Sequence, residues 1–215
     1  MNRIILILII ANVLVSLKGF NDFGFFEKYK FQVGSIRRGE KLRMFTSGFL
    51  HVDYLHLFLN MYALYLFGKV VAVNFGEINF LLIYFGSLLA GSMYSLYQHK
   101  NEYYYSAVGA SGGVSGIIFS AILLYPDMSL IMLPIPIPLP GYVFGIGYLL
   151  YSIYGMKSNL GNIGHSAHLG GAIGGFALTL LLKPYIFTKE PMLVVIMGAI
   201  ILGLLFFGDK INFKK

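Results

Sequence analysis

The nineteen residues AVGASGGVSGIIFSAILLY, positions 107–125, contain no charged side chain. A helix needs about 20 mostly apolar residues to cross the hydrocarbon core of a bilayer, so this run is long enough to be one span. The rest of the chain has the same character, because 57% of the 215 residues are hydrophobic and only 12% are charged. A soluble domain carries about a quarter charged residues. The sequence therefore predicts an all-α polytopic membrane protein.

Seven apolar segments follow one another along the chain, separated by short polar stretches. Their approximate bounds are 4–17, 49–68, 78–97, 107–125, 140–156, 164–183 and 191–208. Seven spans use roughly 140 residues, which leaves no room for a soluble domain. The first segment follows a basic residue, as in a cleaved signal peptide, but no small-x-small cleavage site comes after it, which favours a retained signal anchor.

Two connections between these segments have a distinctive composition. Prolines alternate through residues 134–140, which excludes a helix and predicts an extended connection between the fourth and fifth segments. The longest connection, residues 18–48, combines aromatic side chains with Arg37, Arg38, Lys41 and Arg43. This mixture suits a substructure that lies in the membrane interface.

Composition excludes several classes of function. The chain has no cysteine, so disulfides, thiolate metal sites and a thiol nucleophile are all absent. The net charge of +7 resides between apolar runs rather than on a soluble face, so membrane lipid headgroups, and not nucleic acid, are the expected counter-charge. None of the nine acidic residues falls in the middle of a span, which argues against a proton-coupled transporter and an intramembrane aspartyl protease.

Polar side chains inside apolar spans are costly, and by default they mark function. Those that enter the predicted spans are Asn60, His51, His56, His165, His168 and several serines, among them Ser111. The second, fourth and sixth spans cross in the same direction, so their N-terminal ends share one face of the membrane. At 1.5 Å per residue, His56, Asn60, Ser111 and His168 lie roughly 6 to 16 Å below that face and can converge in one shallow pocket.

Residue spacing in the second span indicates which of its polar side chains share a helix face. His56 and Asn60 are four residues apart, so they occupy the same helix face. His51 precedes His56 by five residues, and in a continuous helix it lies well round from the other two. His51 therefore need not join them in the pocket.

Ser111 lies in the sequence GASG at 109–112, where the glycines leave its hydroxyl uncrowded. Near a helix N-terminus, unpaired backbone N–H groups can also stabilise an oxyanion. In a membrane helix the same motif is more often a packing notch, and the Gly-x-x-x-Gly pairs at 112/116 and 171/175 favour that interpretation. The two interpretations are compatible, because close packing of the fourth and sixth spans brings His168 towards Ser111.

A metal site is the competing explanation of the histidines. His165 and His168 are three residues apart, and His56 could supply a third ligand. No carboxylate and no His-Glu-x-x-His pattern completes such a site, so no metal and no cofactor is expected.

Three separate motifs resemble those of the rhomboid intramembrane serine proteases. They are FLHVDYLHLFLNM at 49–61, GASG at 109–112, and AHLGG at 167–171 with Gly175 following. The resemblance covers residues 35–185 approximately. It implies that Ser111 is the nucleophile, that His168 is the general base, and that His56 and Asn60 help to form the oxyanion hole. It also implies a six-helix catalytic core in residues 1–185, with residues 186–215 forming an additional transmembrane helix and a basic tail.

Two positions depart from the pattern of that family. The family usually has Trp-Arg in the first loop, whereas Leu42 precedes Arg43 here. Four residues after the nucleophile the family often places an aromatic ring that stacks on the catalytic imidazole, and here that position is Ser115. The Ser115 hydroxyl or a neighbouring aromatic residue is expected to take over its role.

The resemblance implies an endopeptidase whose partners are transmembrane protein substrates, cleaved near the membrane surface in a prokaryotic cytoplasmic membrane. The glycine-rich loop 157–164 is a candidate cap over the site, and the aromatic residues of the fifth segment suit either a lateral gate or contact with lipid. The alternative is a catalytically inactive rhomboid-like module that binds or traffics membrane proteins. Such relatives typically lose the serine or the histidine, and this chain keeps both.

Two arguments about orientation disagree. The resemblance places the N-terminus in the cytoplasm and the Ser111 side outside. That arrangement puts twelve basic residues outside and four inside, the reverse of the positive-inside bias. Seven of the twelve fall in residues 18–48, whose charges the headgroups can neutralise if this connection lies on the interface.

Overall fold

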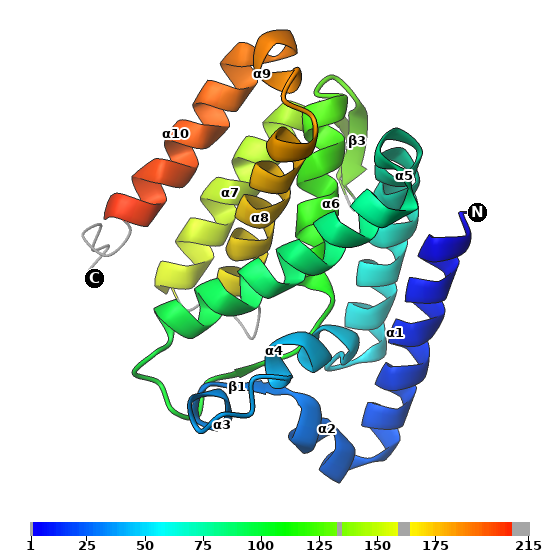
Figure 1. Ribbon diagram of the computed structural model, residues 1–215, viewed down its shortest axis with the longest axis vertical. Helices are drawn as coiled ribbons and strands as arrows, with labels where there is room; N and C mark the ends of the chain where they lie inside the picture. Colours follow the sequence, from blue (N-terminus) through cyan, green and yellow to red (C-terminus); the bar gives the residue numbers. More distant parts are fainter. Residues whose placement is uncertain (1, 133–134, 159–163, 208–215) are drawn as a thin grey trace.

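The computed structural model describes residues 2–132, 135–158 and 164–207. Most of this chain is helical (Figure 1). The helices are α1 (Arg3–Asn21), α2 (Phe23–Tyr29), α3 (Val33–Arg37), α4 (Arg43–Thr46), the 3-10 helix η1 (Ser47–Phe49), α5 (Tyr54–Gln98), α6 (Ser111–Leu124), α7 (Gly141–Ser158), α8 (His165–Leu182), α9 (Ile186–Lys189) and α10 (Pro191–Phe207). The strands are β1 (Phe31–Gln32), β2 (Ser106–Ala107), β3 (Ser129–Met132) and β4 (Ile135–Pro140).

Within the described residues, α1, α5 and α8 are each long and apolar enough to cross a membrane, and α6 and α10 are shorter apolar helices. The 45 residues of α5 span roughly 68 Å at 1.5 Å per residue, about twice the thickness of the hydrocarbon core. Gly76 divides this helix, because its φ of 77° is not helical. Figure 1 shows the two legs of α5 folding back on each other at this point, so each leg supplies one of the expected spans.

The central helix of the bundle is α6. Every one of its residues after Ser111 is buried, and it packs against α5 and α8 (Figure 1). A Cβ on Gly171 would overlap the carbonyl of Gly112, and a Cβ on Gly175 would overlap the backbone of Gly116. The expected close packing of the fourth and sixth spans through paired glycines is therefore confirmed.

The connection after α1 folds into its own substructure, which contains α2, β1, α3, α4 and η1. Arg43 fastens it: its Nη1 donates to the carbonyls of Glu27 (2.7 Å) and Lys30 (3.1 Å), and its Nε donates to Glu40 Oε2 (2.6 Å). Leu42, at the position where the resemblance leads one to expect tryptophan, is 79% exposed. The arginine therefore organises this connection without help from the residue before it.

The structure corrects two sequence-based boundaries. The second segment was expected to begin at 49, but α5 begins at Tyr54, because the Asp53 carboxylate caps it by accepting the backbone N–H of His56 at 2.7 Å. The fourth segment was expected to begin at 107, but α6 begins at Ser111 and the residues before it include β2. The proline-rich connection is extended over the described part 135–140, as predicted, and it pairs with β3 in a hairpin that the sequence did not suggest.

Candidate active site

Ser111 is the first residue of α6, at the end of a tightly held loop. Gly109 has a φ of 131°, which a residue with a side chain rarely adopts. Its N–H donates to the carbonyl of Ser47 at 3.0 Å, and the N–H of Ala110 donates to His51 Nε2 at 3.4 Å. These contacts fix the turn that delivers the Ser111 side chain to the N-terminal end of the central helix.

His56 lies against the same turn. A Cβ built on Gly109 would stand 3.0 Å from His56 Nε2 and 3.6 Å from Ser111 Oγ, so both side chains border the space that glycine leaves open. Asn60, one helical turn further on and buried, donates through Nδ2 to the carbonyl of His56 at 3.0 Å. The expected common face of His56 and Asn60 is therefore confirmed. The Asn60 amide keeps a second N–H that this bond does not use.

His168 reaches the site from α8, four residues into that helix as expected. Ala167, the residue before it, lines the same cavity as Ser111 and Gly112. The ring of Tyr148, on α7, stacks on the His168 ring with centroids 6.1 Å apart and an interplanar angle of 18°. The Tyr148 hydroxyl is 2.6 Å from Ser115 Oγ. Both expected substitutes for the missing aromatic ring, the Ser115 hydroxyl and a neighbouring aromatic residue, thus contribute together.

The structure brings Ser111, His56 and His168 to one end of the bundle, with Asn60 one turn away. Ser111 Oγ and His168 are not hydrogen-bonded to each other, and the serine hydroxyl has no partner among the residues that the structure describes. Catalytic hydrogen bonds often shorten only when substrate binds, so this geometry is compatible with a resting serine–histidine pair.

His51 is the residue that sequence reasoning missed. Because α5 starts at Tyr54, His51 is not part of that helix, and its ring packs against His56 with centroids 4.9 Å apart. The spacing argument left open whether His51 joins the pocket, and the structure places it against His56. Recognising Asp53 as an N-cap would have placed the helix start correctly and would have shown that His51 lies outside the helix.

The hydrogen bonds of His51 determine its protonation. Ser16 Oγ donates to the carbonyl of Phe49 (2.9 Å) and lies 2.8 Å from His51 Nδ1. Since the hydroxyl proton is used on the carbonyl, Nδ1 must be the protonated ring nitrogen, and Nε2 is free to accept the N–H of Ala110. Burial lowers the pKa of His51 from 6.5 to about 3, with a smaller contribution from His56, so the ring is neutral. It connects α1 to the turn before Ser111.

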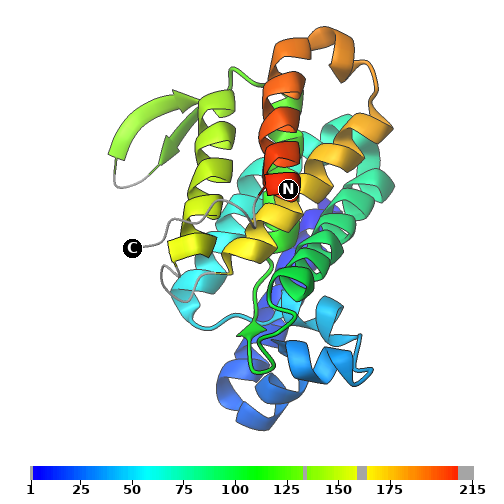
Figure 2. The same cartoon turned by 90° about the vertical axis from the view of Figure 1, so that its left-hand side faces the viewer.

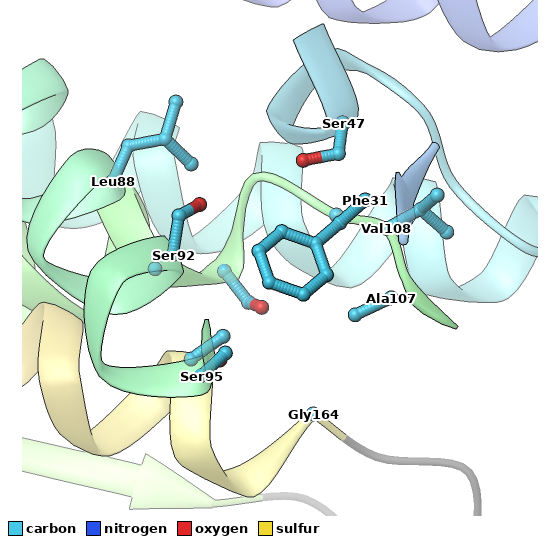
Figure 3. A pocket seen from close by; sticks show the side chains of 12 residues that line it. Phe31, Ser47, Leu88, Ser92, Ser95, Ala107, Val108 and Gly164 are labelled. Atoms are coloured by element: carbon cyan, nitrogen blue, oxygen red, sulfur yellow. The ribbon is translucent and has the colours of Figure 1, made fainter. Parts of the chain in front are cut away.

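A small cavity of about 30 Å³ adjoins Ser111. Figure 3 shows Ser47 and Ser92 on opposite sides of it, the ring of Phe31 beside them, and Gly164 at its lower edge. A cavity needs roughly 10 to 15 Å³ to hold one water molecule, and the water needs two to four polar partners. The cavity has room and hydroxyl groups enough to hold water next to Ser111.

The metal alternative finds no support in the described residues, where no three side chains of His, Cys, Asp or Glu are grouped so as to hold a metal ion. The His165 ring stands nearly perpendicular to that of His168, with centroids 6.3 Å apart, and it also packs edge-on against Tyr151. Most of the expected cap, residues 159–163, lies outside the described residues.

Comparisons with known proteins show what the chain is similar to. The family model described as "Rhomboid domain" matches residues 38–185. The chain is 32% identical over 186 residues to "RHOMBOID-like protein 12, mitochondrial" of Arabidopsis thaliana, a match that covers 79% of this chain and 55% of the relative. It is 32% identical over 139 residues to "Rhomboid protein 1, mitochondrial" of Saccharomyces cerevisiae (63% and 40%) and 31% identical over 180 residues to "Rhomboid protease GluP" of Bacillus subtilis (80% and 33%).

The match thus spans between a third and just over half of the length of these three relatives. They include mitochondrial and bacterial proteins, so they do not support the expected prokaryotic membrane over an organellar one. The apolar helices make the protein an integral membrane protein. With a family match over residues 38–185 and all three motifs at one end of its helical bundle, the chain belongs to the rhomboid family.

Proposed function

We propose that this protein is a serine endopeptidase that cleaves transmembrane proteins near the membrane surface, with Ser111 as nucleophile and His168 as general base. The observation that carries the proposal is the turn at Gly109, which sets Ser111 at the half-buried start of a buried helix, with His56 beside the turn. The glycine pairs between α6 and α8 support it, since they draw the His168 helix against the Ser111 helix. That relatives of this chain include named proteases supports the same activity.

In each half of the reaction His168 accepts one proton and then releases it. Neutral His168 accepts the Ser111 proton while the oxygen attacks the scissile carbonyl carbon, and the resulting imidazolium protonates the leaving amine. Water then attacks the acyl-enzyme, with His168 again taking the proton and returning it to Ser111. No cofactor or metal is needed for any of these steps.

The oxyanion has donors at the start of α6 and on α5. No described side chain caps α6, so the backbone N–H groups of its first turn are available to a developing negative charge. The Asn60 amide and the His56 ring approach from the first leg of α5. The cavity beside Ser111 is suited to supply the water for deacylation.

The depth of the site suits a membrane-embedded substrate. His168 lies roughly 4 to 5 Å along α8 from its first residue, so the reaction takes place just inside one membrane surface. A substrate helix must unwind near its end to offer a carbonyl there. In this proposal residues 1–185 form the catalytic unit, and the apolar helix α10, which packs on α7, is an addition to it.

The test uses purified protein in neutral bicelles with a fluorescent transmembrane peptide and, separately, a fluorophosphonate probe. Wild type should cleave the peptide and be labelled at Ser111, whereas Ser111→Ala and His168→Ala should do neither, because the two residues act as one unit. Ser152→Ala, a buried serine on α7, is the matched control and should behave as wild type. Unchanged cleavage by Ser111→Ala excludes the proposal. A folded wild type that neither cleaves nor is labelled favours the inactive binding module.

A further inference from the structure

Tyr148 bridges three helices. It belongs to α7, its hydroxyl pairs with Ser115 Oγ of α6 at 2.6 Å, and its ring stacks on His168 of α8. The ring of Phe119, also on α6, packs against it with centroids 5.8 Å apart. Other tyrosines of α7 differ in this respect: Tyr142, Tyr151 and Tyr154 are 39%, 50% and 53% exposed. Tyr148 therefore faces the bundle, while these neighbours face outward.

The helix that carries His168 gives the imidazole little support of its own. The neighbours of a helical residue lie three and four positions away. For His168 these are Gly164, His165, Gly171 and Ala172, and three of them are too small to fix the orientation of a ring. The nearly parallel ring of Tyr148 supplies the missing surface. Such aromatic pairs are favourable at centroid distances of 4.5 to 7 Å, and the face of the ring also suits the imidazolium formed during attack.

We infer that Tyr148, held by Ser115, is the positioning residue that orients His168, so that α7 completes the active site. The inference rests on the proposed function. It makes activity depend on where α7 lies, because moving α7 away from α6 breaks the bond to Ser115 and withdraws the ring from the imidazole. Such movement is feasible, since α7 packs chiefly on α8 and only lightly on α6 and α10, and Figure 2 shows it at the edge of the bundle.

The test measures peptide cleavage and the rate of fluorophosphonate labelling at Ser111 in the same preparations. Tyr148→Leu, which removes ring and hydroxyl, should lower kcat and the labelling rate about tenfold and leave KM unchanged. Tyr148→Phe and Ser115→Ala should each lower both rates about threefold to fivefold. Their combination should be no worse than either one alone, because both substitutions remove the same bond. Ser152→Ala and Tyr185→Leu are the matched controls.

The labelling rates and kinetic constants of these variants test whether Tyr148 positions His168. Labelling of Tyr148→Leu at the wild-type rate overturns the inference, and so does a raised KM with unchanged kcat, which would make Tyr148 a substrate contact. If Tyr148→Leu does not fold, additive effects of Tyr148→Phe and Ser115→Ala overturn it instead. These outcomes leave the proposed function intact as long as wild type, but not Ser111→Ala, is labelled. A wild type without labelling refutes both.

Discussion

Because His51 is neutral in the native protein, the free energy of unfolding should fall as the pH falls below 6.5. The change to test is His51→Asn, whose amide can still donate to Ser16 but cannot titrate. The unfolded chain takes up a proton below pH 6.5, whereas the native His51 resists protonation until about pH 3. Proton uptake therefore favours the unfolded state, and stability falls as the pH drops from 6.5 towards 3, with no contribution from His51 above 6.5.

The loss of folding free energy follows from the pH interval over which the unfolded chain binds a proton at His51 and the native protein does not. One unit of pKa difference corresponds to about 1.4 kcal/mol, so about 1.5 units between pH 6.5 and 5 remove about 2 kcal/mol. This figure requires only that the native pKa of His51 lies below 5, and burial lowers it to about 3. Wild type should therefore lose about 2 kcal/mol more than His51→Asn between pH 7.5 and 5.

The assay is the free energy of unfolding by steric trapping in neutral bicelles at the two pH values. The chain has no cysteine, so the labels can be attached to introduced cysteines without competing sites. Ser16→Ala is the control: it should be less stable than wild type at pH 7.5 by about 1 to 3 kcal/mol, because the buried Nδ1–H loses its partner, and it should keep the acid dependence. Equal losses in wild type and His51→Asn would refute the protonation argument.

Three further substitutions test the site and the packing. Gly109→Ala should reduce labelling of Ser111 at least tenfold, because its φ of 131° and the approach of His56 leave no room for a Cβ, and wild-type labelling would contradict the described turn. Asn60→Ala should slow cleavage by about two to three orders of magnitude if its free N–H binds the oxyanion. An effect on thermal stability alone would make Asn60 structural. Gly175→Leu should prevent folding, because its side chain would meet the Gly116 backbone, whereas Gly147→Leu, where nothing lies within 4 Å of a built Cβ, should leave the thermal midpoint nearly unchanged.

Part of the candidate site could be predicted from residue spacing. His56 and Asn60 share a helix face because they are four residues apart, and the glycine pairs indicated that α6 and α8 touch. The contact of His51 was missed because helix periodicity was extended to residues before the Asp53 cap. Side chains before a cap follow the loop and not the helix, so their direction cannot be obtained from spacing.

By itself the sequence determined that the chain is an apolar helical membrane protein. The length of each apolar segment can be counted directly in the sequence. Within lipid, the backbone N–H and C=O groups of such a segment find partners in the helix itself. The sequence also determined that His56, Asn60 and His168 lie in helices. Only the tertiary structure decided that His51 joins Ser16 to the turn at Ala110, and that the ring stacked on His168 is that of Tyr148 on α7. These contacts join residues on different helices, and which faces meet depends on the packing of all the helices together, which no local pattern encodes.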